Sequence, residues 1–300
     1  MKTVYLDHNV VHYYVAGFPS NVDEGAERRA LDEIDRNRDV LRIVFSAWNL
    51  VEASREGPWD RVSLLAQFIQ ERDPYWIVDR RVLQLAELRT FVFSQLFHVD
   101  PSGFRRDAIA PYLSQVLHDL TPQSPVLVGE RAEDYIGYMF NHHQDQQRIR
   151  DEESRTPEAL NILQQARKNG HLTPKLSAQM NKEWISLSIP DRAPDEQPLT
   201  PALRAEVLAY CLGHYAELLS ECPCMQSEHL LADYRTESAT RKPQTQDCID
   251  LMYMAPALAY CDVLTTHDRY LIAQVKRYAK DTGRPVVVRR LLSEIAKEFI

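Results

Sequence analysis

Several acidic residues of this 300-residue chain lie where a folded protein could use them to bind metal ions. Asp7 directly follows the short apolar run Thr3–Leu6, and Asp268 lies two residues beyond another run that ends at Thr266. Glu52 follows a third such run by six residues. Carboxylates that converge from distant parts of a chain repel one another unless cations neutralise them or some take up protons. Because oxygen ligands select hard cations, the expected metal is Mg²⁺ or Mn²⁺ rather than zinc.

Asp247 and Asp250 add two acids near the start of a predicted helix that runs to about Tyr260. They are three residues apart and therefore share one helix face. Asp250 has apolar neighbours, so we expect it to be largely buried and to need a partner. Two metal ions about 4 Å apart would activate a water for phosphodiester cleavage without a nucleophilic side chain. The predicted ligands are Asp7, Glu52, Asp250 and Asp268, with Asp247 as a candidate fifth.

Short strands that alternate with helices must position these acids. Apolar runs predict five strands, at residues 3–6, 41–46, 75–78, 262–266 and 285–288. Nearly continuous apolar strands separated by helices are typical of a parallel sheet covered on both faces. Ligands collect beyond the carboxyl ends of such strands. We therefore predict an α/β three-layer sandwich with a central parallel sheet of about five strands.

The middle of the chain has a different character. Almost no strand signal occurs between about Phe97 and Gln246, where polar amphipathic helices are expected at 144–168, 175–188 and 201–221. Proline-rich breaks separate these helices. We predict an α/β domain from residues 1–97 and 245–300, and an all-helical insertion or subdomain from residues 98–244.

Three stretches resemble the signature segments of the PIN-domain nuclease family: Val4–Asn9, Ser46–Glu52, and Asp250 through Leu264–Asp268. The resemblance covers about residues 1–97 and 245–290. It implies a parallel sheet flanked by helices, with metal-dependent cleavage of RNA or, in one branch, of structured DNA. Many bacterial members are toxins of toxin–antitoxin pairs. These toxins are much shorter than this chain. The implied metal ligands are Asp7, Glu52, Asp250 and Asp268, and the supporting polar residues are Asn9, Ser46, Asn49 and Thr266.

Charge restricts how the chain could hold a nucleic acid. A net charge of −8 and a pI near 5.7 give no global positive field, so binding needs a local basic patch. The most basic stretch, residues 269–300, directly follows the last predicted ligand; a solvated helix face is the alternative interpretation. No apolar stretch is long enough to span a membrane and no signal peptide is evident, so we expect a cytoplasmic protein. The predicted nucleic-acid contacts are Arg269, Lys276 and Arg277, with Arg80 and Arg81 as a second group.

Simpler interpretations stay open. Asp7 could be a helix cap or a turn residue, Glu52 a solvated helix acid, and Asp268 a helix cap. Ser46 and Asn49 could be local caps. Two rival functions are a catalytically inactive PIN-like binding module and a metallohydrolase of small phosphoesters. A zinc site built from soft and imidazole ligands matches no established spacing; its residues would be Cys211, His214, Cys222, Cys224 and His229.

The sequence as a whole favours a metal-dependent endonuclease, with RNA preferred over DNA as substrate. In this interpretation Asp250→Asn abolishes cleavage and leaves the fold intact. The sequence does not decide whether the protein binds an antitoxin or another protein partner, or whether it forms a homodimer. The role of the helical insertion is also undecided.

Overall fold

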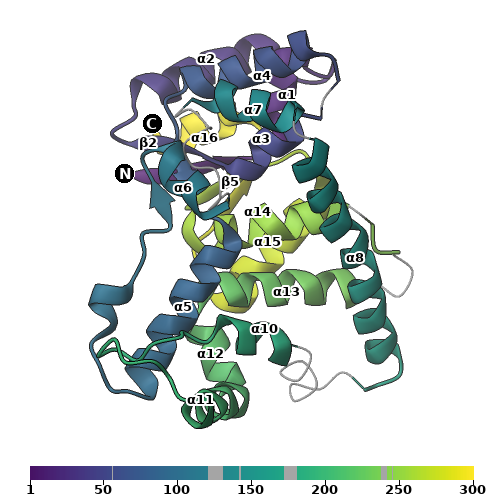
Figure 1. Cartoon of the computed structure of the whole chain (residues 1–300). Coiled ribbons are helices and arrows are strands. Elements are labelled where there is room, and N and C mark those ends of the chain that lie inside the picture. The colour runs from purple at the N-terminus through teal and green to yellow at the C-terminus, as the bar shows by residue number, and fades with distance from the viewer. Residues whose placement is uncertain (56, 121–130, 142, 172–180, 238–241, 245) are drawn as a thin grey trace. The chain divides into compact units, whose positions relative to one another are not determined.

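The computed structural model describes the chain apart from residues 56, 121–130, 142, 172–180, 238–241 and 245. It divides into two compact units (Figure 1). Unit 1 comprises Met1–Asp79, Ala108–Glu152 and Met252–Ile300, and unit 2 comprises Arg80–Asp107 and Glu153–Leu251. Two helices, α8 (His143–Lys168) and α14 (Gln246–Tyr260), run from one unit into the other.

Unit 1 contains a six-stranded sheet with the order β4-β3-β2-β1-β5-β6. All neighbouring strands are parallel except β4, which pairs antiparallel with β3. The five parallel strands overlap the five predicted apolar runs, so the α/β class is confirmed, while the two-residue β4 was not predicted. The strands are β1 (Lys2–Leu6), β2 (Leu41–Ser46), β3 (Tyr75–Ile77), β4 (Ile109–Ala110), β5 (Val263–Thr265) and β6 (Val287–Arg289).

Helices lie on both faces of this sheet. Right-handed crossovers place helices on opposite faces where the strand order reverses, and here it reverses between β1 and β5. Figure 1 shows α2, α4 and α16 on one side of the strands and α15 on the other. The helices of unit 1 are α1 (His8–Ala16), α2 (Glu24–Arg36), α3 (Ala47–Ala53), α4 (Trp59–Glu71), α6 (Leu113–Leu120), α7 (Ala132–Asn141), α15 (Arg269–Thr282) and α16 (Leu292–Phe299).

The core explains why the strand runs are so uniformly apolar. Val4, Tyr5 and Leu6 of the central strand β1 have no exposed surface. On one face the buried carboxylate of Glu27 accepts hydrogen bonds from the backbone N–H groups of Leu292 (2.8 Å) and Ser293 (3.2 Å). This contact satisfies two amides at the start of α16 and fixes that helix to α2.

Unit 2 is helical, as the middle of the chain predicts. Apart from one isolated bridge between Arg192 and Pro198, its described residues form no β-structure. Buried Glu87 accepts from the backbone N–H groups of Cys224 (2.7 Å) and Met225 (3.2 Å), which satisfies the start of α13. Besides its part of α8, the unit contains α5 (Arg80–Gln95), η1 (Pro101–Phe104), α10 (Lys182–Ser188), α11 (Pro201–Gly213), α12 (Tyr215–Glu221) and α13 (Pro223–Glu237).

The limits of the two units differ from the boundaries expected at 97/98 and 244/245. Residues 108–152 belong to unit 1 because β4 pairs with β3 and α7 packs on α3 and α4. Helix α5, expected in the α/β domain, belongs to unit 2. A two-residue strand is too short to show a periodic pattern, so β4 left no signal in the sequence. Part of the predicted helix 175–188 lies outside the described residues.

Candidate functional site

Two neighbouring strands of the sheet bring predicted site residues together. In the β1–β5 pairing Leu6 lies opposite Thr265, so Asp7 and Thr266 follow side by side. The backbone N–H of Asp7 donates to the carbonyl of Thr265 (3.0 Å), which continues the ladder by one residue. Since the strand order reverses here, this carboxyl edge is where an open α/β sheet forms a ligand crevice.

Asp7 is a buried carboxylate with three neutral side-chain donors. Its Oδ2 accepts from the Thr266 hydroxyl and from the Asn9 amide, both at 2.6 Å. Its Oδ1 accepts from the Tyr253 hydroxyl at 3.0 Å. Only 3% of Asp7 is exposed, and burial raises its pKa while the bonds from Thr266 and Tyr253 oppose that rise. A nearby cation would therefore stabilise its ionised form.

Asn9 and Thr266 connect the ends of β1 and β5. The Asn9 amide also approaches the Thr266 hydroxyl (3.3 Å), and its Oδ1 accepts from the backbone N–H of His267 (3.1 Å). The Thr266 hydroxyl, which donates to Asp7, accepts from the backbone N–H of Asp268 (3.1 Å). One hydroxyl thus links the two acids that were predicted from separate strands.

Asp268 caps α15. Its Oδ1 accepts from the backbone N–H groups of Tyr270 (2.7 Å) and Leu271 (3.2 Å), so the interpretation of Asp268 as a helix cap is confirmed. The residue is exposed. It therefore presents a carboxylate to solvent at the start of α15, two residues after Thr266.

Ser46 and Asn49 form a capping box at the start of α3, which confirms their interpretation as local caps. The fully buried Asn49 accepts from Ser46 N–H (2.7 Å) and from the Tyr5 hydroxyl (3.0 Å), and donates to the Leu6 carbonyl (3.2 Å). These bonds fix α3 to the end of β1.

Glu52 lies on the same short helix and is half-buried. Burial raises the pKa of the Tyr5 hydroxyl well above its usual range, and the negative charges of Asp7 and Glu52 raise it further. Both acids therefore lie within electrostatic reach of one buried hydroxyl in unit 1.

Asp250 and Asp247 have a different partner from the predicted metal. In unit 2 the fully buried Arg235 donates from Nη2 to Asp250 Oδ2 (3.0 Å) and from Nη1 to the Asp247 carbonyl (2.6 Å). Its Nε lies 3.7 Å from Asp247 Oδ1. Asp250 does need a partner, as predicted, but a guanidinium fills that role here.

Three residues of these networks were not predicted from the sequence. Arg235 left no signal, because nothing in a helical pattern shows which buried acid an arginine will reach. Tyr253 lies three residues after Asp250 on α14, so its helix face could have indicated it. Asp79 follows β3 by two residues, just as Asp268 follows another strand; it is buried, and the Trp48 indole donates to it at 3.3 Å.

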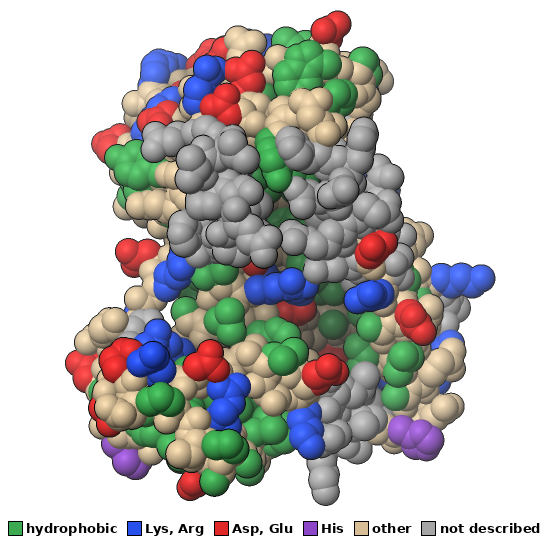
Figure 2. All heavy atoms as spheres, in the orientation of Figure 1, with side chains coloured by type: hydrophobic (Ala, Val, Ile, Leu, Met, Phe, Trp, Pro, Cys, Tyr) green, Lys and Arg blue, Asp and Glu red, His purple; other side chains and the backbone are tan. Residues whose placement is uncertain are grey.

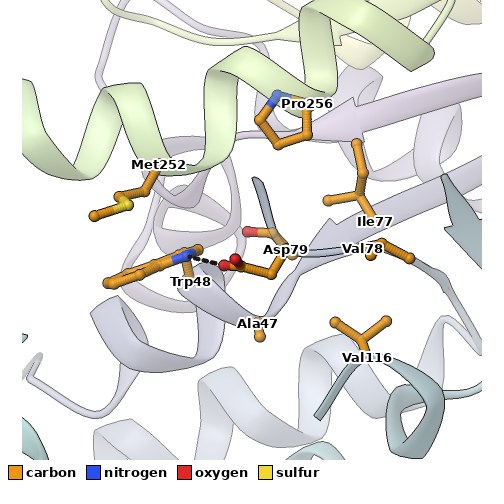
Figure 3. A pocket seen from close by; sticks show the side chains of 9 residues that line it. Ala47, Trp48, Ile77, Val78, Asp79, Val116, Met252 and Pro256 are labelled. Atoms are coloured by element: carbon orange, nitrogen blue, oxygen red, sulfur yellow. Dashed lines mark hydrogen bonds between the residues drawn. The ribbon is translucent and has the colours of Figure 1, made fainter. Parts of the chain in front are cut away.

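Figure 3 shows the surroundings of this Trp48–Asp79 contact. Met252 and Pro256 from α14 and Val116 from α6 lie around it, together with Ile77 and Val78. The pocket between these side chains has no space for a water molecule. It is a packed part of unit 1 rather than a ligand site.

The predicted basic groups are dispersed. Arg269 and Lys276 are exposed on α15, whereas Arg277 pairs with Asp281 (3.4 Å) and Arg80 pairs with Glu228. Arg81 is exposed on α5 in unit 2. Over α2, near the top of Figure 2, basic and acidic side chains alternate.

No group of three or more His, Cys, Asp or Glu side chains suitable for holding a metal ion occurs among the residues that the structure describes. The cysteines of the alternative zinc site are buried, and burial raises the pKa of Cys211 to about 12. The described residues form no group suitable for holding a metal ion there either.

Comparison with protein-family models, curated proteins and solved structures found no match for the chain. The PIN resemblance therefore rests on the motifs alone. Within the described part of the chain, no helix has both the length and the apolar character needed to cross a membrane.

Proposed function

We propose that the chain is a divalent-metal-dependent nuclease that cleaves RNA at the carboxyl edge of β1 and β5. The observation that carries this proposal is the buried carboxylate of Asp7 at the point where the strand order reverses. Its three described side-chain donors are neutral, and the Thr266 hydroxyl also accepts from the backbone N–H of the exposed acid Asp268. A buried carboxylate whose described hydrogen-bond donors are neutral favours a bound cation.

The residues at this edge fit a Mg²⁺ or Mn²⁺ ion. Mg²⁺ keeps several waters and is often held by one or two carboxylates together with substrate phosphates, so it needs no dedicated cage of three acids. Asp7 and Asp268 would hold the ion, with Glu52 as a further predicted ligand. When bound, it supplies an activated water and offsets charge on the phosphate.

Neighbouring side chains prepare the two acids for this role. Asn9 and Thr266 fix the orientation of the Asp7 carboxylate, and Tyr253 holds its other oxygen. The Asp268 backbone is fixed by Thr266 and by its cap on α15. Asp250 stays a predicted ligand; in unit 2 its carboxylate pairs with Arg235.

A matched pair of helix caps tests the proposal. Asp268 and Asp23 are both exposed N-cap residues of unit 1, and asparagine caps a helix as well as aspartate does. Asp268→Asn should therefore lose most Mn²⁺-dependent cleavage of a labelled RNA oligonucleotide, whereas Asp23→Asn should cleave at the wild-type rate. Asp7→Asn should behave like Asp268→Asn. Wild-type cleavage by Asp268→Asn, or cleavage that persists in excess chelator, would refute the proposal.

A catalytically inactive binding module is the second candidate. It is favoured by the pairing of Asp250 with Arg235 and by the lack of a three-ligand metal group in the described residues. This candidate predicts that Mg²⁺ and Mn²⁺ leave the melting temperature unchanged. The nuclease predicts an increase, because ions that bind only the folded acids stabilise the fold by mass action.

A further inference from the structure

A row of aromatic and basic side chains extends from the candidate metal site along α1. Asn9 and Tyr13 are four residues apart and share one face of that helix. The Tyr13 ring packs edge-on against His267, with 4.6 Å between ring centroids. The His267 backbone is held by Asn9, and His267 itself stands between Thr266 and Asp268. Both rings are half-buried, so part of each reaches solvent directly beside the acids.

Cationic groups accompany these rings. Arg61, near the start of α4, places Nη2 2.9 Å from Nε2 of His12, and the His12 ring lies 6.1 Å from that of Tyr13. Because the chain as a whole carries a charge of −8, a local positive charge such as that of Arg61 is what binding a polyanion requires.

We propose that Tyr13, His267 and Arg61 form a binding surface for single-stranded nucleic acid beside the metal site. Bases stack on the two rings and Arg61 contacts the backbone phosphate. Aromatic rings next to a positive group are the usual means of holding single strands, since every base offers a face for stacking. A duplex hides those faces. This inference rests on the proposed function for its substrate class, but binding can be measured without cleavage.

The test is fluorescence anisotropy of the full-length protein with a short unstructured RNA, the same sequence in DNA, and the matching RNA duplex, all in chelator. The double substitution Tyr13→Leu/His267→Ala should weaken binding of the single strand about tenfold. Tyr210 of α11 and His214, the C-cap residue of that helix, form a comparable stacked pair in unit 2, with centroids 4.1 Å apart. Tyr210→Leu/His214→Ala should therefore bind like the wild type.

Arg61→Gln provides a second measurement that misfolding of the double variant does not affect. Loss of one phosphate contact should reduce the slope of log affinity against log salt by about 0.7. An unchanged slope overturns the proposal, as does wild-type binding by a folded Tyr13→Leu/His267→Ala variant. Equal wild-type affinity for duplex and single strand also overturns it.

The two proposals fail separately. Weakened binding by these variants, with no cleavage by the wild type in Mn²⁺, leaves the binding surface standing and removes the nuclease. If the wild type cleaves RNA with Mn²⁺ and the variants bind RNA as the wild type does, the nuclease proposal is supported and the binding-surface proposal is refuted.

Discussion

Replacing Asp250 by asparagine tests the buried ion pair of unit 2. The side chains of Arg235 and Asp250 are 1% and 11% exposed, and their charged atoms are 3.0 Å apart. Removing one partner of a buried pair costs about 3–5 kcal/mol, because the remaining charge is left uncompensated. Asp247 still lies near the guanidinium, at 3.7 Å. We therefore expect Asp250→Asn to lower the free energy of unfolding by about 3 kcal/mol, the lower end of that range.

Urea unfolding followed by circular dichroism measures this change. Asp233→Asn is the control: its partner Arg167 is 2.8 Å away, but the two side chains are 30% and 27% exposed. A pair screened by solvent contributes at most about 1 kcal/mol, so this variant should remain close to the wild type. An Asp250→Asn variant within about 0.5 kcal/mol of the wild type would refute the reasoning and restore the view that this substitution leaves the fold intact.

Three further predictions concern other buried groups. Burial raises the folded-state pKa of Asp7, so without metal the wild-type stability should fall as the pH rises through that pKa. Asp7→Asn should remove this decline and be more stable at pH 7; unchanged pH dependence of unfolding would contradict the assignment. Gln274 is 4% exposed and its amide has no hydrogen-bond partner among the described residues. Gln274→Leu should therefore raise the free energy of unfolding, measured by urea titration, by about 1 kcal/mol. A lower free energy of unfolding would show that the amide has an unrecognised partner. The five cysteines are buried, so a thiol reagent should label them only after denaturation; rapid labelling of the native protein would contradict their burial.

The sheet could be predicted because its signal is local. Each parallel strand is a short apolar run buried on both faces, as the unexposed Val4, Tyr5 and Leu6 illustrate. The edge strand β4 and the limits of the two units could not be predicted, because they depend on packing between segments far apart in the sequence. Residues 108–152 join unit 1 through contacts with β3, α3 and α4 that no periodic pattern encodes.

Part of the site was also predictable from the sequence, and part was not. Asp7 and Thr266 had to meet once β1 and β5 were adjacent, since each follows the end of its strand. The role of Asp268 as a helix cap was visible from the helix after it. The partner of Asp250 was not, because the sequence indicates that a buried acid needs a counter-charge but not whether a metal or Arg235 provides it.

A crystal of the wild-type protein soaked in Mn²⁺ is the most direct test of the metal site. Anomalous scattering should show manganese within ligand distance, about 2.0–2.6 Å, of oxygens from Asp7 and Asp268. The same soak of Asp7→Asn should give no peak there. Saturating Mn²⁺ without a peak beside Asp7, or with equal peaks in both crystals, would contradict the account.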